Sequence, residues 1–499
     1  MSFLGSILSE TAIAARSLAD YVTGTGLRLG VTGLSRSGKT VFLTALVHNL
    51  LRLSKSSAAE PRRTFPVFRV HAENRLTKAL LEQQPNDAVP RFAYEKHLAA
   101  LTGGAEGKDA RRWPESTSRI SELRLTLEFE RKEGWRKGPS SLTLDIVDYP
   151  GEWLLDLPLL EKSFAEFSRD TVEASSAPSR APLAADWRAF IAQLDPKAPA
   201  SEEAAQDAAK AFTSYLRASR NDRYALSTLS PGRFLMPGDL DGSPALTFAP
   251  LQLQAGEDYP SGTLGAMMER RYESYKTHVI RPFFRDHFSR LDRQIVLVDA
   301  LASLNSGPAA VRDLENAMGE VLNAFRTGRS TLFSTLFHPR IDRILFAATK
   351  ADHLHHTSHD RLEEILRQLV ARAIARAENL GASIDVIALA AVRATREAKV
   401  RHYGEMLDAI VGTPLAGETI HGEIFDGLSE AAIFPGELPA DPKQVFRGDG
   451  LAISDDEAAY RFLRFRPPVI DPPLEGRPAP LPHIRLDRAL EFLIGDRLV

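Results

Sequence analysis

A glycine loop between an apolar strand and an apolar helix constrains this chain more than any other feature. Residues 33–40 read Gly-Leu-Ser-Arg-Ser-Gly-Lys-Thr and fit the pattern G-x-x-x-x-G-K-[ST], which is typical of phosphate-binding loops. An apolar run over 27–33 precedes the loop, and an apolar, helix-like stretch over 41–53 follows it. The pattern predicts a strand, a loop whose backbone N–H groups surround anionic oxygens, and a helix whose dipole favours the same charge.

Each residue of this loop has an expected chemical role. We expect Lys39 to reach the β- and γ-phosphates of a nucleotide and the Thr40 hydroxyl to bind Mg²⁺, which makes both candidate catalytic residues. The alternative is a glycine-serine loop that only caps the helix. The remaining loop contacts to phosphate are predicted from Ser35, Arg36, Ser37, Gly38 and Val41.

A second motif, Asp148-Tyr-Pro-Gly151, follows a predicted β-hairpin. Apolar residues alternate over 123–129 and 142–147, with a turn region between them. Asp148, at the end of a strand, is expected to hold Mg²⁺, and the Gly151 N–H to approach a γ-phosphate. Glu152 is predicted to orient an attacking water. The alternatives are ordinary Asp-x-Pro-Gly turn chemistry and a solvated Glu152.

A third motif, Thr349-Lys350-Ala-Asp352, ends an apolar strand and points to guanine. The guanine base presents a ring N–H and an exocyclic amine side by side, and one carboxylate can accept from both. We therefore expect Asp352 to select guanine and the Lys350 stem to cover the base. The alternative is that Asp352 is an acidic cap at a helix N-terminus.

Composition removes several classes of function. The chain has 499 residues, a net charge of −3 and no cysteine, so disulfide frameworks, thiolate catalysis and cysteine-ligated metals are excluded. The near-neutral charge gives no reason to expect nucleic acid as a partner. No stretch reaches the roughly 18 apolar residues of a membrane span. We expect a cytoplasmic protein whose N-terminal helix, 1–24, packs on the protein itself.

The rest of the chain predicts an α/β fold with a mainly parallel sheet. Fully apolar strands over 295–298, 344–348 and 384–391 alternate with helical patterns. Helices are also expected over 73–81 and 92–101, and most of 154–290 is expected to be helical. The segment 221–262 is expected to be either a long loop or loosely ordered.

The three motifs, in this order, resemble the G domain of Ras-like and translation-factor GTPases. In more detail the chain is similar to the bacterial YcjX-like family of phosphate-loop NTPases, on motifs that run from the glycine loop to the closing Arg488-Ala-Leu-Glu-Phe-Leu. These motifs also include Arg112-Trp-Pro, Asp148-Tyr-Pro-Gly-Glu-Trp153, Val298-Asp-Ala-Leu301, Thr349-Lys-Ala-Asp352 and Val392-Arg-Ala-Thr395.

The resemblance implies a Ras-like G domain that binds GTP or GDP with Mg²⁺. It implies a protein effector, with a membrane protein encoded nearby as one candidate, a link to stress response, and a position in the cytoplasm or peripherally at the inner membrane. The predicted organisation is an N-terminal helix (1–24), a discontinuous core (25–53, 112–153 and 292–413), helical insertions (54–111 and 154–291), and a C-terminal extension with a closing helix (414–499).

The resemblance also assigns further residues. Ala391 or Val392 would donate a backbone N–H to the guanine carbonyl. Thr117 would bind Mg²⁺ and sense the γ-phosphate, with Ser116 and Ser118 as competitors. By analogy with Gα subunits, Arg111 or Arg112 could supply an arginine in cis, the alternative being a solvated pair.

Together these patterns predict a guanine-nucleotide switch with slow, Mg²⁺-dependent hydrolysis. The alternatives are an ATPase in which Asp352 is only structural, a phosphate-loop kinase for a small molecule, and a scaffold that keeps nucleotide for stability. Four histidines follow Asp352, at 353, 355, 356 and 359. Their spacing would allow metal binding, with Asp360 nearby, but we interpret them as a solvated loop over the nucleotide.

Overall fold

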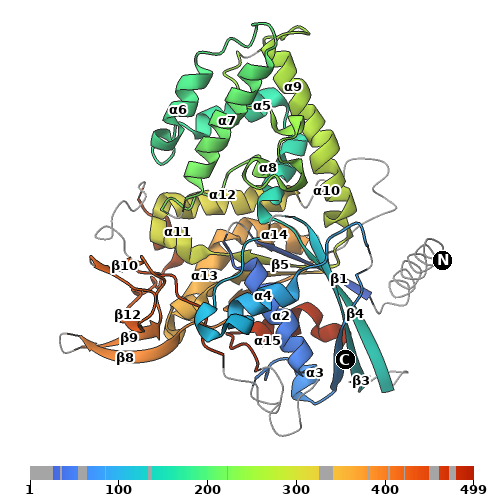
Figure 1. The fold of residues 1–499 in the computed structure, drawn as a ribbon, viewed down its shortest axis with the longest axis vertical. Helices are drawn as coiled ribbons and strands as arrows, with labels where there is room; N and C mark the ends of the chain where they lie inside the picture. The colour runs from blue at the N-terminus through green and yellow to red at the C-terminus, as the bar shows by residue number, and fades with distance from the viewer. Residues whose placement is uncertain are drawn as a thin grey trace.

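The computed structural model describes most of the chain as an α/β core that carries a helical insertion (Figure 1). The predicted N-terminal helix over 1–24, and also Ser35 and Ser118, lie outside the described residues. The described residues are 26–33, 36–53, 64–84, 86–117, 119–132, 138–221, 223–254, 256–324, 341–379, 381–402, 405–420, 422–448, 460–470 and 479–499.

The core is a seven-stranded sheet with the strand order β2-β3-β4-β1-β5-β6-β7. The five strands from β4 to β7 run parallel, while β3 is antiparallel to both of its neighbours, so the mainly parallel sheet is confirmed. The strands are β1 (Gly26–Gly33), β2 (Leu76–Glu82), β3 (Ser121–Arg131), β4 (Gly138–Asp148), β5 (Arg293–Val298), β6 (Arg343–Ala348) and β7 (Ser383–Ala388).

Both faces of the parallel strands are buried, which explains their continuous apolar sequences. On β6, Leu345 and Ala347 join one core cluster, whereas Ile344 and Phe346 join the cluster on the opposite face. The first cluster is covered by α2 (Lys39–Leu53), α3 (Arg69–Ala72), α4 (Tyr94–Thr102) and α15 (Leu486–Ile494). The second is covered by α11 (Ala300–Ser306), α12 (Pro308–Ala324), α13 (His359–Leu369) and α14 (Ala371–Asn379).

The helix predicted over 73–81 is wrong, because most of this segment forms β2. It pairs with β3 in antiparallel register, with Leu81 opposite Leu125. Its burial does not alternate regularly, and the ladder is irregular between Leu76 and Lys78. The pairing edge of β3, rather than the local sequence pattern, determines this strand.

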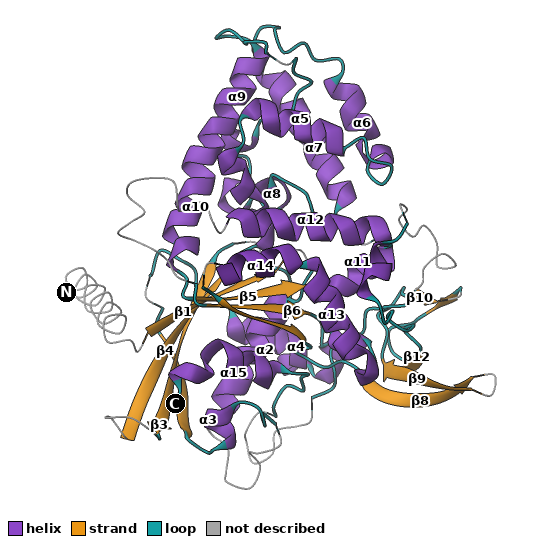
Figure 2. Cartoon of the chain, turned by 180° about the vertical axis from the view of Figure 1, so that it is seen from behind, coloured by secondary structure: helices purple, strands orange, loops and turns teal. Residues whose placement is uncertain are grey.

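The helical insertion stands on one side of the sheet, with α12 between the two (Figures 1 and 2). The predicted helical character of 154–290 is confirmed. The segment 221–262 is a long loop with a few short helical turns, as expected, but it is not loosely ordered, because Phe248 and Leu251 are fully buried against the insertion's helices. The helices are α5 (Phe164–Ala174), α6 (Ala181–Ile191), α7 (Glu202–Ser219), α8 (Gly232–Leu235), α9 (Leu264–Tyr275) and α10 (Arg281–Asp286).

A small sheet extends the structure beyond β7 (Figure 1). Its strands are β8 (Arg396–His402), β9 (Glu405–Gly412) and β12 (Ala431–Ile433), in the order β12-β9-β8, and a separate pair consists of β10 (Thr419–Ile420) and β11 (Glu423–Ile424). The predicted closing helix is confirmed as α15. Among the described residues, no helix is long and apolar enough to cross a membrane.

A buried aspartate joins the insertion to the segment after the second motif. Asp156 lies in the 3₁₀ helix Gly151–Glu161 and accepts hydrogen bonds from the Tyr275 hydroxyl (2.6 Å) and the Gly232 N–H (2.6 Å). Burial raises the pKa of Asp156 to about 6 from its ordinary value of 3.8, although both hydrogen bonds oppose the shift.

This shift predicts a pH-dependent stability difference between the wild type and Asp156→Asn. Because the pKa of Asp156 is higher in the folded protein than in the unfolded chain, proton binding by Asp156 stabilises the folded protein most below pH 3.8. This stabilisation is lost as the pH rises through 6. Between pH 4.5 and pH 7 the free energy of unfolding of the variant should therefore rise by roughly 2 kcal/mol relative to that of the wild type. Urea unfolding at both pH values measures this gain. An unchanged difference would show that Asp156 is ionised in the folded protein throughout.

Candidate functional site

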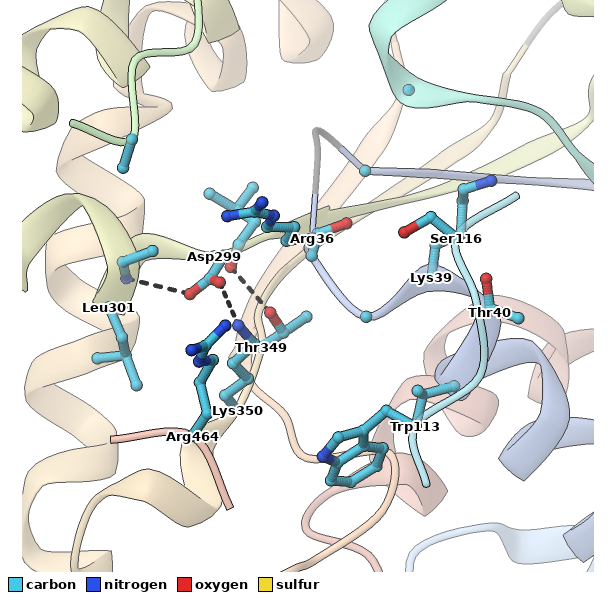
Figure 3. A pocket seen from close by; sticks show the side chains of 18 of the residues that line it. Arg36, Lys39, Thr40, Trp113, Ser116, Asp299, Leu301, Thr349, Lys350 and Arg464 are labelled. Carbon is cyan, nitrogen blue, oxygen red and sulfur yellow. Dashed lines mark hydrogen bonds and ion pairs between the residues drawn. The ribbon is translucent and has the colours of Figure 1, made fainter. Parts of the chain in front are cut away.

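The three motifs meet at one cavity of about 680 Å³ at the carboxyl ends of the parallel strands. In Figure 3, Arg36, Asp299, Lys350 and Arg464 gather on one side of it, and Lys39 and Thr40 on the other. The predicted residues that line the cavity are Arg36, Ser37, Gly38, Lys39, Thr40, Val41, Thr117, Gly151, Glu152, Thr349, Lys350, Asp352, Ala391 and Val392. Ser35 lies outside the described residues. Asp148 is not among the residues that line the cavity, but its carboxylate forms an ion pair with Lys39, which does line it.

The backbone of the glycine loop has the conformation that an anion cradle needs. Gly38 has a φ of +79°, with open space where a Cβ would be, and Arg36 has a φ of +64°. A Cβ on Gly33 would lie 2.1 Å from Ser37 Oγ and 2.9 Å from the Leu297 carbonyl oxygen, so this approach requires glycine. The buried Ser37 hydroxyl has no hydrogen-bond partner among the described residues. It is therefore a donor available to an anion.

Three oxygen-bearing side chains converge beside Lys39. Thr117 Oγ1 donates to Asp148 Oδ2 (2.7 Å) and lies 3.2 Å from Thr40 Oγ1, and Lys39 forms an ion pair with Asp148. Two hydroxyls and a carboxylate are the hard oxygen donors that Mg²⁺ prefers, so these residues fit the ion. Ser116 also lines the cavity, but it is the Thr117 hydroxyl that bonds to the Asp148 carboxylate.

At the opposite end of the cavity, Asp352 is tied to the loop after β7. Its Oδ2 accepts from the Ala394 N–H (2.8 Å), and its backbone carbonyl accepts from the Thr395 hydroxyl. Asp352 is 4% exposed. Asp352 itself lies in the 3₁₀ helix Ala351–His353. The next α-helix, α13, begins after Ser358 without a side-chain cap, so Asp352 does not cap it.

The Lys350 side chain crosses to β5. Lys350 has a φ of +60°, and its ammonium forms an ion pair with Asp299, the residue after β5. Asp299 Oδ1 in turn caps α11 by accepting from the Ala302 N–H (3.1 Å). The cap fixes Asp299, and the ion pair then fixes Lys350 along the wall of the cavity.

The C-terminal segment supports the loop that contains Ala391 and Val392. Ala390 and Ile484 exchange two backbone hydrogen bonds, of 3.1 and 2.8 Å. The same segment reaches α2, where the Leu481 N–H donates to Asn49 Oδ1 (3.0 Å). The segment 481–484 therefore links α2 to the loop that contains Ala391 and Val392.

Three arginines that the motifs do not reveal also line the cavity: Arg220, Arg223 and Arg464. Arg220 follows α7 and pairs with Glu152 (2.7 Å), whereas Arg464 comes from the C-terminal extension and pairs with Glu418 (2.6 Å). Burial lowers the pKa of the Arg36 guanidinium, and the nearby cations Arg220 and Arg464 lower it further. No spacing in the sequence connects these positions, because separate parts of the chain supply them.

The two arginines considered for a role in cis do not line the cavity. Arg111 donates to the Pro467 carbonyl (2.7 Å), and Arg112 is exposed, 4.0 Å from Glu106. Arg111 is mostly buried, so the alternative of a solvated pair fits Arg112 alone. Trp113 donates to the Phe465 carbonyl (2.6 Å), so this stretch docks onto the C-terminal extension.

The solvated histidine loop is wrong. His353 is buried against the Phe465 ring, with centroids 5.3 Å apart, and the buried His359 contacts the Ala351 carbonyl oxygen (2.9 Å). His355 is also buried, and only His356 is exposed. The loop packs inward because the C-terminal extension covers it.

Comparison with known proteins agrees with this geometry. The family described as "YcjX-like family, DUF463" matches residues 27–498. A protein of Escherichia coli (strain K12) named "Ras-like GTPase YcjX" is 40% identical over 485 residues, which cover 95% of this chain and 96% of the relative. A protein of Shewanella oneidensis with the same name is 32% identical over the full length of both chains. The chain belongs to the YcjX-like family.

Proposed function

We propose that this protein binds guanine nucleotide with Mg²⁺ and hydrolyses GTP slowly, as a molecular switch. The observation that carries the proposal is the single cavity that the phosphate loop, Gly151 and Asp352 all line, with Asp148 beside it. Two relatives that match almost the whole chain are named as Ras-like GTPases, which supports the same reading.

The phosphate end would be bound by backbone amides and cations. Lys39, the loop N–H groups and the unpartnered Ser37 hydroxyl are the donors expected to contact the β- and γ-phosphates. Burial lowers the pKa of Arg36, and repulsion from Arg220 and Arg464 lowers it further. A bound polyphosphate would relieve this repulsion.

Thr40, Thr117 and Asp148 would hold Mg²⁺. When bound, the ion neutralises charge on the β- and γ-phosphates. Thr40 and Thr117 contribute hydroxyl oxygens, and Asp148 contributes a carboxylate that the Thr117 hydroxyl already orients. When a nucleotide binds, the Lys39 ammonium would leave the Asp148 carboxylate and contact a phosphate oxygen instead.

Guanine would bind at the Asp352 end. We infer that the Asp352 carboxylate accepts from the ring N–H and the amine, while Ala394 holds its orientation. Ala391 or Val392 would donate to the guanine carbonyl, and Lys350 would cover the base plane. Thr349 lies beside them at the end of β6.

The switch would operate through the segments at Thr117 and Gly151. Contacts to a γ-phosphate would order them, and hydrolysis would release them. The helical insertion is positioned to sense this change, because Gly232 packs so closely on Glu152 that a Cβ would lie 1.8 Å from its carbonyl oxygen. A protein effector, a role in stress response and a cytoplasmic or inner-membrane position remain predictions.

The wild-type protein provides the test of this function. Competition of GTP, GDP and ATP against a fluorescent guanine nucleotide measures base preference, and phosphate release without an acceptor measures hydrolysis. We expect GTP and GDP to compete more strongly than ATP, and Mg²⁺-dependent release of phosphate. Tighter binding of ATP would favour the ATPase, whereas release only with an acceptor would favour the kinase.

The Glu152–Arg220 pair predicts a separate effect on turnover. Glu152 would orient the attacking water, and its ion pair with Arg220 would hold the Glu152 carboxylate near the γ-phosphate. Arg220→Ala should lower the rate of GTP hydrolysis by roughly 100-fold, and leave GDP affinity within a few-fold, because GDP lacks the γ-phosphate. Single-turnover rates and GDP titration measure the two quantities. Arg217→Ala, in the last turn of α7, is the control, and equal rates of hydrolysis in the two variants would remove Arg220 from the mechanism.

A further inference from the structure

Two histidines in the loop after Asp352 meet an acidic side chain of β8. His356 Nδ1 lies 2.8 Å from Glu397 Oε2, and His355 Nε2 lies 3.9 Å from the same oxygen. One ligand atom from each of the three residues lies within 4.8 Å of those from the other two. The sequence shows only the histidines together; Glu397 reaches them because β8 returns past this loop.

The donor set suits a divalent transition metal better than Mg²⁺ or Ca²⁺. Two imidazole nitrogens and one carboxylate oxygen are ligands that Zn²⁺ and its neighbours prefer, whereas the two hard cations prefer oxygen alone. Ligand atoms in a tetrahedral zinc site lie roughly 3.4 Å apart. The measured separations bracket this value, so side-chain rotations would suffice to close the site.

The second nitrogen of His355 already has the partners that orient a metal ligand. His355 Nδ1 lies 3.0 Å from Thr357 Oγ1 and 3.5 Å from Asp408 Oδ2 on β9. A carboxylate on the far ring nitrogen fixes the tautomer that presents the other nitrogen to a metal. His355 is also buried, so its ring has little freedom to turn away.

The neighbouring cations leave the ligand atoms accessible. Arg393 contacts Glu397 through Oε1 (3.5 Å), which is the oxygen that does not face the histidines. Lys399 contacts Asp408 through Oδ1 (3.7 Å), again away from His355. The side chains of His356 and Glu397 are 63% and 29% exposed, so an ion can enter from solvent.

We propose that His355, His356 and Glu397 form a binding site for a zinc-class divalent ion, separate from the Mg²⁺ ligands at the phosphate loop. Three protein ligands leave a fourth position for water. The ion would clamp the loop after Asp352 to the β8–β9 hairpin, close to the hydrogen bond that joins Asp352 to Ala394 in the loop before β8.

The test uses the untagged full chain, stripped of metal with EDTA, without nucleotide and in excess Mg²⁺. Titration with Co²⁺ should give the visible absorption of a four-coordinate nitrogen-oxygen site, saturating at one ion per chain and displaced by Zn²⁺. His356→Ala and Glu397→Gln should weaken affinity by roughly 100-fold or more, and Asp408→Asn by about 10-fold. Zn²⁺ should also slow hydrogen exchange across β8 and β9 in wild type but not in Glu397→Gln.

Matched controls remove other surface groups of the same chemistry. His278→Ala deletes an exposed histidine of the insertion, and Glu430→Gln deletes an exposed acid near β12, so both should keep wild-type affinity. Because His356 is mostly exposed, its variant should fold, which circular dichroism checks. An unchanged Co²⁺ spectrum in His356→Ala, or no stoichiometric binding by wild type, overturns the site. Neither outcome bears on the nucleotide, which is absent throughout.

Discussion

Replacing Lys39 by alanine is expected to lower the rate of GTP hydrolysis by at least about 100-fold. In the proposed mechanism the lysine would stabilise charge that develops on the γ-phosphate, and loss of one such donor costs roughly 100- to 1000-fold in rate in other enzymes. In the ligand-free protein Lys39 also neutralises Asp148, which is 1% exposed. Single-turnover phosphate release measures the rate.

Stability must be followed in the same experiment, because Lys39→Ala leaves a buried carboxylate without its cation. Thermal unfolding of the variant, with and without GDP, separates loss of fold from loss of catalysis. Lys78→Ala, on the exposed side of β2, removes a lysine that contacts no part of the cavity and serves as the control. Turnover equal to wild type in a folded Lys39→Ala protein would refute the catalytic role and favour the nucleotide-stabilised scaffold.

Asp352→Asn is expected to change base preference from guanine to xanthine. The asparagine oxygen can still accept from the Ala394 N–H, so the loop keeps its anchor. The amide nitrogen then faces the base as a donor, where guanine offers donors and xanthine an acceptor. A good bidentate pair discriminates bases by about 1–3 kcal/mol, so GTP affinity should fall roughly 10- to 100-fold while xanthosine triphosphate affinity rises.

Competition titrations of GTP, xanthosine triphosphate and ATP against both proteins measure this change. Asp360→Asn is the matched control, because it alters an exposed aspartate of the same segment that pairs with Arg485. If the affinity of the Asp352 variant fell equally for all three nucleotides, Asp352 would have a structural role only. If it kept its preference for GTP, the guanine contact would lie elsewhere in the cavity.

Local patterns predicted the elements whose sequence and environment agree. The apolar strands β5 and β6 lie between two packed layers, so uninterrupted hydrophobic runs identify them. The sequence of β3 alternates because every second side chain, from Leu123 to Phe129, packs in the same core cluster, while the side chains between them point to the opposite face. The structure also brings the residues of the three motifs to one cavity, because each motif follows the carboxyl end of a strand of the same sheet.

Local patterns failed where distant segments determine the structure. Residues 76–82 become a strand only because β3 offers an open edge, and Phe248 is buried only because the insertion's helices surround it. Arg220, Arg464 and Glu397 share this cause, since each reaches its partners from a separate part of the chain.

The position of α15 has a consequence for the order in which this protein folds during synthesis. Leu490 and Leu493 pack in the same core as β1 and α2, and Arg293 on β5 forms an ion pair with Asp496. The phosphate loop therefore leaves the ribosome long before the residues that complete the core beneath it. Nascent chains would expose that apolar surface until α15 has been synthesised, so chaperones would matter most in the period before α15 emerges.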